Sequence, residues 1–360
     1  MLAWGSPMDR EKLSEQAKRV FGSLGGAMTA AMIHLGDRLG LYRALAGAGP
    51  VDSRALAERT GLHERWLREW LYQQGAAGVL EYRGEGRFEL SPEGAAILAD
   101  ENHPAFGAGF FGDLPQAVAR VEQLPESFRT GLGQCYDDFG PETARGIERG
   151  LAPWFRTFLV PVVLPRLEGM IPDLERGIAA ADVGCGAGVA LLELAKNFPA
   201  SEFRGYDISQ LALARAGENL REAGIKNVSF HDAAGDPLPD DGRFGLITSF
   251  DCLHDMTHPG TVMGQIRGAL ADDGTWLIAD IKAHASYEDN VERNPMAAMM
   301  YGTSLIACMS SALSEPDGLG LGTLGFHPEL AREMTSEAGF SRFEVLDIDH
   351  PVNAFYAVRP

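Results

Sequence analysis

The feature that most constrains the fold of this sequence is a regular alternation of apolar strands and amphipathic helices from about residue 171 to the C-terminus. β-rich runs such as RFGLITSFD, residues 243–251, alternate with helical runs such as LALARAGENLREAG, residues 211–224. This order is typical of an α/β domain whose parallel strands are buried between layers of helices. We therefore predict a doubly wound parallel sheet for this part of the chain.

The preceding residues predict a different architecture. Residues 27–45 place apolar side chains three and four positions apart, which indicates a buried amphipathic helix. Two further helices meet at Gly61, with Ser53 as the expected N-cap, and a two-stranded ribbon and a helix capped by Ser91 follow. This pattern predicts a helix-turn-helix with a wing.

The length of 360 residues favours two domains. We assign residues 1–100 to the winged-helix domain and residues 171–360 to the α/β domain. Residues 101–170 are rich in aromatic side chains, and we expect them to form helices that connect the two domains and roof a pocket.

Composition and charge narrow the class of protein. The formal net charge is -19, and residues 51–100 hold nine acidic side chains against six arginines, which disfavours nucleic-acid binding. No apolar run reaches the roughly 18 residues of a membrane helix, no signal-peptide layout opens the chain, and the four cysteines form no C-x-x-C pair. We expect a cytoplasmic protein without membrane contact.

The stretch FDCLHDMTHP, residues 250–259, reads like a zinc-protease H-E-x-x-H motif with aspartate in the glutamate position. That motif works only on a helix, where residues four apart share a face. Here a strand precedes it and Pro259 follows His258 directly, which disfavours a helix across His254 and His258. We therefore predict no metal site.

Small and acidic residues stand at the ends of successive predicted strands, where α/β sheets bind ligands. Gly184, Gly186 and Gly188 follow the first strand, and the absence of a glycine at 189 departs from the nicotinamide fingerprint. Asp207 ends the second strand and Asp232 the third. A carboxylate in the position of Asp207 suits ribose hydroxyls, so these strand ends predict a slot for an adenosine-containing ligand.

The motifs DVGCGAG, GYDIS, HDAAGDPLP and FDCLHD are similar in order and spacing to those of class I S-adenosylmethionine-dependent methyltransferases. The resemblance implies a Rossmann-like fold: a seven-stranded, mostly parallel sheet with an antiparallel last strand, preceded by a mainly α winged-helix domain that dimerises. FDCLHDMTHP together with residues 300–325 resembles an actinobacterial subgroup of small-molecule methyltransferases. The implied cofactor is S-adenosyl-L-methionine, with S-adenosyl-L-homocysteine as its product.

The resemblance also implies roles for individual residues. Those expected to contact the cofactor are Asp182, Gly184, Gly186, Gly188, Asp207, Ile208, Asp232, Ala233, Phe250 and Asp251. His254 lies where related O-methyltransferases keep a catalytic histidine, although Met256 replaces their usual tryptophan. A neutral imidazole can accept a hydroxyl proton at physiological pH, with Asp255 expected to orient the ring. The alternative is that His254 only caps the helix that follows.

The part of the site that binds the methyl acceptor is expected to be apolar. Residues 294–313 form one predicted helix rich in methionine, and the glycine-dense stretch after it suggests a mobile lid. Candidate acceptor contacts are Phe158, Met299, Met300, Tyr301 and His327. We expect O-methylation of an apolar or aromatic hydroxylated small molecule by a homodimer. Two alternatives stay open: a cofactor-sensing regulator that binds DNA through its winged helix, and an enzyme of this fold with non-methylating chemistry.

Overall fold

A computed structural model describes residues 8–360 of the chain, which divides between Leu114 and Pro115 into two compact units. The predicted connector, residues 101–170, falls on both sides of this division. Among the described residues, no helix has the length and apolar character needed to cross a membrane.

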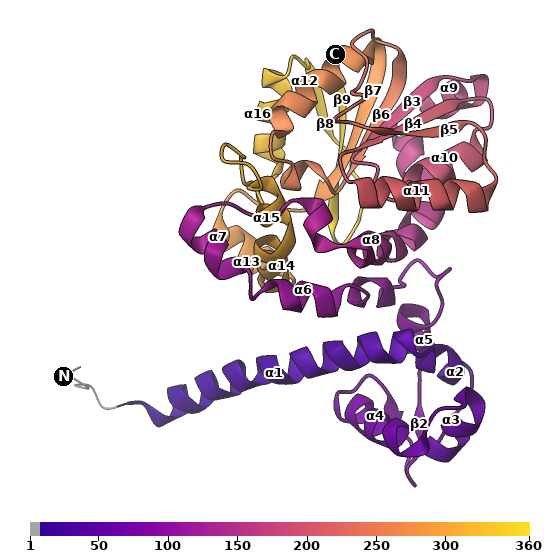
Figure 1. The fold of residues 1–360 in the computed structure, drawn as a ribbon, viewed down its shortest axis with the longest axis vertical. Helices are drawn as coiled ribbons and strands as arrows, with labels where there is room; N and C mark the ends of the chain where they lie inside the picture. Colours follow the sequence, from indigo (N-terminus) through magenta and orange to yellow (C-terminus); the bar gives the residue numbers. More distant parts are fainter. Residues whose placement is uncertain (1–7) are drawn as a thin grey trace. The chain divides into compact units, whose positions relative to one another are not determined.

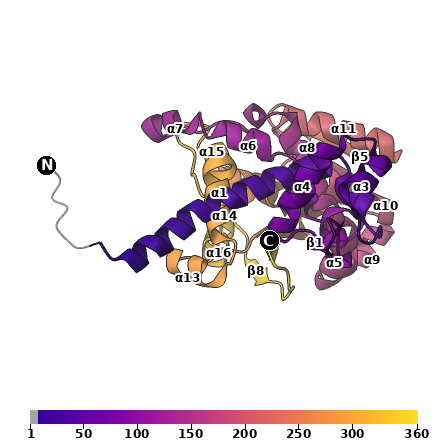
Figure 2. The ribbon, with the colours of Figure 1, turned by 90° about the horizontal axis from the view of Figure 1, so that it is seen from below.

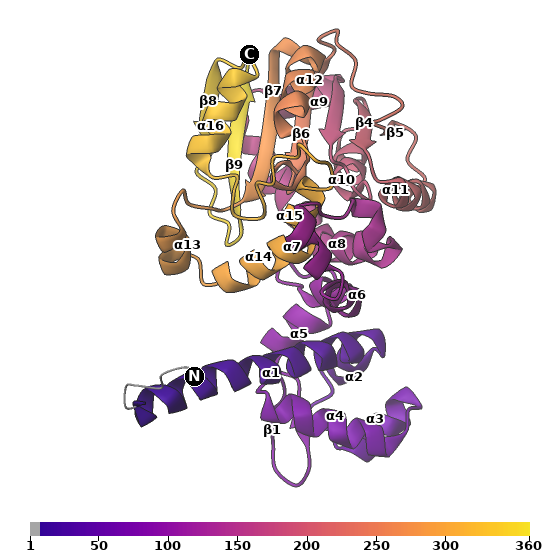
Figure 3. The same ribbon diagram turned by 60° about the vertical axis from the view of Figure 1, so that its left-hand side comes forward.

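The second unit is built on a seven-stranded sheet in the order β5-β4-β3-β6-β7-β9-β8, so that β8 and β5 lie at its two edges (Figure 3). Only β9 runs antiparallel to its neighbours, which confirms the predicted fold class. The strands are β3 (Ala179–Val183), β4 (Glu202–Asp207), β5 (Val228–Asp232), β6 (Phe244–Phe250), β7 (Leu270–Ile281), β8 (Arg342–Val345) and β9 (Asn353–Arg359).

Helices cover both faces of this sheet (Figure 1). On one face lie α9 (Met170–Arg176), α10 (Val189–Asn197) and α11 (Gln210–Ala223), and on the other lie α12 (Pro259–Ala269) and α16 (Pro328–Glu337). The central strands are buried on both sides, which explains their unbroken apolar sequences. α12 ends at Ala269, because Leu270 already pairs with Phe244 at the start of β7.

Two helical segments carry residues toward the carboxyl ends of the strands. Before the sheet come α6 (Leu114–Arg120), α7 (Leu124–Thr130), η2 (Tyr136–Phe139), α8 (Pro141–Trp154), the π-helix η3 (Phe155–Val163) and η4 (Leu164–Arg166). After β7 come α13 (Tyr287–Arg293), α14 (Ala297–Thr303), η6 (Ser304–Cys308) and α15 (Met309–Ala312). The helix predicted over residues 294–313 therefore begins at Ala297 and contains a π-helical turn at η6, a feature frequent at functional sites.

The first unit contains the winged helix, as predicted. Figure 2 shows its first element, α1, as one long helix. The elements are α1 (Arg10–Arg38), α2 (Leu41–Leu45), α3 (Ser53–Thr60), α4 (Glu64–Ala76), β1 (Glu81–Tyr82), β2 (Phe88–Glu89), α5 (Pro92–Leu98) and η1 (Ala108–Phe111). Ser91 caps α5 as predicted, whereas α3 is capped by Asp52 rather than Ser53, because the Asp52 carboxylate accepts the Ala55 N–H at 2.8 Å.

Candidate active site

A turn of three glycines links β3 to α10. Gly184, Gly186 and Gly188 all have positive φ angles, which residues with a Cβ rarely adopt. A Cβ on Gly184 would lie 2.6 Å from Cys252 Sγ, and one on Gly188 would overlap the ring of Phe230, so packing excludes side chains at both. A Cβ on Gly186 would meet nothing within 4 Å. The middle glycine therefore faces open space in which a ligand could lie against the backbone.

Asp207 is bound to this turn from the end of β4. Its carboxylate accepts the Gly186 N–H at 2.8 Å through one oxygen and the Ser209 N–H at 2.8 Å through the other. Burial raises the pKa of Asp207, although the two backbone donors oppose the shift. Asp232 lies opposite Asp207 in the register of β4 and β5, and the Ala233 N–H donates to the Asp207 carbonyl at 2.9 Å. The structure thus brings the predicted turn and the two strand-end acids to one edge of the sheet.

Ile208 and Asp182 occupy opposite environments beside this turn. Ile208 follows Asp207 and is 65% exposed, so it offers an apolar surface next to a polar strand end. Asp182 is buried within β3, where Thr248 Oγ1 donates to its carboxylate at 2.7 Å and burial raises its pKa to about 7. The Asp182 side chain therefore binds the neighbouring strand inside the sheet.

His254 is held by a buried carboxylate at the end of the neighbouring strand. It lies in the short turn η5 (Leu253–Asp255) after β6 and is 3% exposed. Its Nδ1 lies 2.6 Å from Oδ1 of Asp280, which ends the buried part of β7. Burial lowers the pKa of His254, but the charge of Asp280, helped by Cys308, outweighs it and raises this pKa well above its usual value. Because Nδ1 is engaged by Asp280, Nε2 is the nitrogen that would exchange a proton, and the Cys308 side chain also interacts with the ring.

The contact with Asp280 corrects the predicted role of Asp255. The hydrogen bond that orients the His254 ring comes from the adjacent strand rather than from the next residue in the chain. Burial raises the pKa of Asp255 to about 7, with the His254 charge opposing the shift and the Asp280 charge adding to it. Asp280 could have been identified from the sequence in the same way as Asp207 and Asp232, since it is an acid near the end of the β-rich run GTWLIADI, residues 274–281.

Asp251, at the end of β6, has a left-handed backbone with φ of 50°. Its N–H donates to the Ala279 carbonyl at 2.8 Å, and its carboxylate accepts a hydrogen bond from the Asn353 side chain. Burial and the nearby Asp280 charge raise the pKa of Asp251 to about 7. A non-glycine residue in this conformation persists only when its surroundings hold it, and such residues cluster at functional sites.

Phe250 belongs to a wall of aromatic rings centred on Trp154. The indole Nε1 of Trp154 is buried and has no hydrogen-bond partner within residues 8–360. Burial lowers the pKa of His350 to about 4, and its Nδ1 accepts the Asn353 N–H at 2.9 Å, so this imidazole is neutral. The wall is therefore uncharged. The rings whose centroids lie within 6.0 Å of Trp154 are those of Phe155, Phe158, Phe250, His350 and Phe355.

The five predicted acceptor contacts do not form one group. Phe158 packs against His350 in the aromatic wall, with ring centroids 5.6 Å apart. Met300 is buried in a separate apolar cluster against which Tyr301 packs. Met299 is 60% exposed, and the His327 side chain caps α16.

Residues 314–323, which we call the strap, are bound to the loop that carries His254. The Gly322 N–H donates to the His254 carbonyl at 3.1 Å, and the Leu319 N–H donates to the Thr257 carbonyl at 2.9 Å. The strap includes the first part of the predicted lid, which is therefore hydrogen-bonded to the loop that carries the candidate base.

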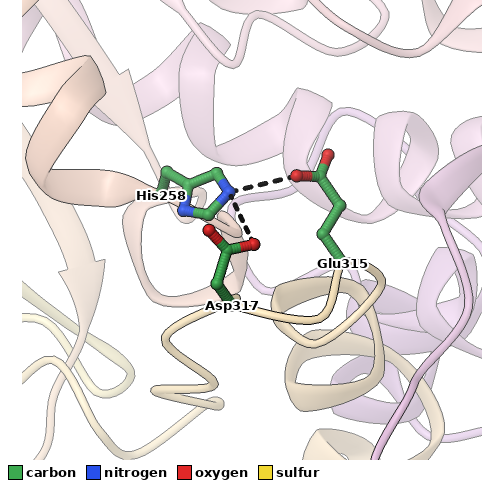
Figure 4. Close-up of side chains that lie close together, drawn as sticks. All are labelled: His258, Glu315 and Asp317. Atoms are coloured by element: carbon green, nitrogen blue, oxygen red, sulfur yellow. Dashed lines mark hydrogen bonds and ion pairs between the residues drawn. The ribbon is translucent and has the colours of Figure 1, made fainter.

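His254 and His258 do not share a helix face. η5 ends at Asp255, and α12 begins only at Pro259, with His258 as its N-cap. The His258 ring instead faces Glu315 and Asp317 of the strap (Figure 4). The H-E-x-x-H arrangement is thus excluded by local geometry.

Comparison with known families agrees with this architecture. Residues 174–320 match the family model of a methyltransferase domain, and residues 27–100 match that of an Rv2258c-like winged helix-turn-helix domain.

Curated relatives include two Streptomyces enzymes. The 3-hydroxy-5-methyl-1-naphthoate 3-O-methyltransferase of Streptomyces sahachiroi is 29% identical over 256 residues, covering 67% of this chain and 70% of the relative. The mitomycin biosynthesis 6-O-methyltransferase of Streptomyces lavendulae is 29% identical over 191 residues, covering 49% of this chain and 52% of the relative.

Solved structures share the fold over nearly the whole chain. Human N-acetylserotonin methyltransferase in complex with SAM has a TM-score of 0.68 at 20% identity, with 99% of both chains covered. An O-methyltransferase family protein from Burkholderia thailandensis has a TM-score of 0.67 at 13% identity, with 98% of both chains covered.

Proposed function

We propose that this chain, which belongs to the S-adenosylmethionine-dependent methyltransferases with an N-terminal winged-helix domain, methylates a hydroxyl oxygen of a small molecule. The observation that carries the proposal is the buried His254–Asp280 pair, with Nδ1 and Oδ1 at 2.6 Å. His254 follows β6 and Asp280 lies in β7, and β6 also pairs with β3, which leads into the glycine turn. A base and a ligand-binding turn on adjacent strands suit the transfer of a group from a bound cofactor to an acidic hydroxyl.

S-adenosylmethionine, when bound, supplies a methyl group on a positively charged sulfur. The residues present fit such a ligand, because the open space at Gly186 lies beside the carboxylate of Asp207. We assign the ribose hydroxyls to Asp207, the face of the adenine to Ile208, and the adenine edge to Asp232 and Ala233. Phe250 and Asp251 are assigned to the methionine portion, and Gly184 and Gly188 shape the turn.

The chain's own contribution to the reaction is alignment and proton removal. His254 Nε2 accepts the hydroxyl proton of the acceptor as the oxygen approaches the methyl group, and Asp280 stabilises the resulting imidazolium. The aromatic wall excludes water and keeps the two reactants aligned, which is the main requirement when the methyl donor is already activated.

We infer the acceptor class from the aromatic wall around Trp154. The wall around Trp154 is apolar and uncharged, and the naphthoate-derived acceptor named for the Streptomyces sahachiroi relative is a hydroxylated aromatic acid. We propose an aromatic or similarly apolar hydroxylated acceptor, with Phe158 the most favoured of the predicted contacts. Met300 and Tyr301 stay secondary candidates.

The winged helix is assigned no nucleic-acid role. Arginines that would contact phosphate in α4 and the ribbon are already paired with acids of the same unit. We propose instead that this unit supports a homodimer, because α1 exposes a row of large apolar side chains that suits a second copy. They are Leu13, Val20, Phe21, Leu24 and Met28.

Calorimetric titration with S-adenosylhomocysteine tests the cofactor site. We expect saturable binding by the unmodified chain and loss of about tenfold or more in affinity on Asp207→Ala, because a charged hydrogen-bond acceptor contributes roughly 1.5–3 kcal/mol. Asp272→Ala is the matched control, since Asp272 is exposed near the amino end of β7.

Equal affinity of the Asp207 and Asp272 variants, or no binding by the unmodified chain, would contradict the assignment of the slot. If the cofactor binds and hydroxylated aromatics are consumed without gaining a methyl group, the non-methylating alternative holds.

A further inference from the structure

Three metal-ligand side chains converge where the strap meets the loop after β6 (Figure 4). His258 Nε2 lies 3.0 Å from Glu315 Oε2 and 3.9 Å from Asp317 Oδ1. The three atoms all lie within 4.8 Å of one another. A tetrahedral ion with bonds near 2.1 Å separates its ligands by about 3.4 Å, so small side-chain adjustments would place all three around one ion.

The charge at this position is unbalanced. Glu315 and Asp317 both face the His258 ring, and across residues 8–360 neither forms an ion pair with a lysine or arginine. Two carboxylates therefore share an imidazole that supplies at most one positive charge. A divalent cation would neutralise this surplus in a chain that already carries a net charge of -19.

A tight turn holds the backbone of Glu315 and Asp317 close together. Pro316 separates the two acids, and the Gly318 N–H donates to the Glu315 carbonyl at 3.1 Å, which closes a turn with proline in its second position. His258 occupies the N-cap of α12, yet its side chain makes no capping hydrogen bond there. The imidazole is thus free to act as a ligand while the helix forms without it.

We propose that His258, Glu315 and Asp317 bind a divalent transition-metal ion, with water in the remaining positions. One imidazole nitrogen and two carboxylate oxygens suit Zn²⁺, a borderline ion that accepts both donor types. The site is separate from the His254–Asp280 pair, and the ion takes no part in methyl transfer.

The ion would fasten the strap to the loop that carries the base. Two backbone hydrogen bonds already join them, at Leu319–Thr257 and Gly322–His254. The His258–Glu315 contact at 3.0 Å already joins the other end of the strap to the loop, and an ion held by His258, Glu315 and Asp317 would strengthen this attachment. Its effect on turnover rests on the proposed function, whereas ion binding and strap protection do not.

Titration of the EDTA-treated full-length chain with Zn²⁺ alone tests the site. We expect one ion per chain and affinity lower by about tenfold or more for Glu315→Gln and Asp317→Asn, since lesser changes around metal sites already cost 10–100-fold. These variants keep the shape of exposed side chains, so they should fold. His327→Asn is the matched control, because His327 pairs with a single acid, Glu329, at 2.9 Å.

Two results would overturn the metal site: no saturable binding by the unmodified chain, or the same affinity in all four proteins, which would mean adventitious binding only.

Limited proteolysis with chymotrypsin tests the fastening of the strap, because Leu319 is 54% exposed within it. With Zn²⁺ present, we expect slower cleavage after Leu319 in the unmodified chain than in Asp317→Asn, and equal rates in EDTA. Cleavage unaffected by Zn²⁺ in a chain that binds the ion would refute the fastening. Neither readout uses S-adenosylmethionine, so failure here is distinguishable from failure of the proposed enzyme activity.

Discussion

Asp280 sets the protonation of His254, and the pH dependence of the reaction should show it. The carboxylate, 2.6 Å from Nδ1, holds the pKa of His254 above its usual value. A base must be neutral to accept a proton, so kcat/KM should rise as the pH increases through this raised pKa. Asp280→Asn removes the charge. We expect it to move the acid limb to lower pH and to reduce kcat by about 10²–10⁴-fold, the range that general-base catalysis supplies. The pH-rate profile with a hydroxylated aromatic acceptor is the measurement.

Asp273→Asn, an exposed position in the same strand, is the control and should leave the profile unchanged. An Asp280→Asn enzyme whose acid limb does not move would show that this carboxylate does not control the base.

At the scale of elements, substitutions at two glycines in the turn between β3 and α10 should affect stability and ligand binding differently. Gly188→Ala places a Cβ against the Phe230 ring at a backbone φ of 76°. We expect the free energy of unfolding, measured by thermal denaturation, to fall by roughly 2–5 kcal/mol, because left-handed strain and overpacking add. Gly186→Ala meets open space and should cost only the strain, about 1–2 kcal/mol, yet it should weaken S-adenosylhomocysteine binding because its Cβ points into the proposed slot. Unchanged affinity in a folded Gly186→Ala protein would place the ligand elsewhere.

At the scale of the whole molecule, α1 carries large apolar side chains that the single chain does not bury. A helix of 29 residues is about 44 Å long, and its row of large apolar side chains is exposed. Phe21, at 68% exposure, and Leu24, at 60%, lie near the middle of this row. We expect the unmodified chain to sediment as a dimer and Phe21→Ser/Leu24→Ser to sediment as a folded monomer. Trp66→Gln, at another exposed apolar side chain, should stay dimeric; a concentration-independent monomer in the unmodified chain would refute the interface.

Much of the candidate site could be predicted from local sequence. The glycine turn and His254 each follow a strand, and Asp207 and Asp232 each end one. These strands can be predicted from their apolar runs, and the carboxyl ends of parallel strands meet at one edge whatever the order of the strands. The winged helix could also be predicted from local sequence, since helical periodicity and the cap at Ser91 depend on neighbouring residues only.

The hydrogen-bond partner of His254 could not be predicted from local sequence in this way. The chain places Asp255 next to His254, but η5 is a single tight turn, and the pairing of β6 with β7 brings Asp280 to the ring from 26 residues away. The aromatic wall and the convergence of His258 with the strap likewise join segments distant in sequence. The sequence alone determined which residues stand at the ends of which elements, because period, glycine and cap are properties of neighbouring residues. Which side chains face one another was decided only by the tertiary structure, because strand order and register set those contacts.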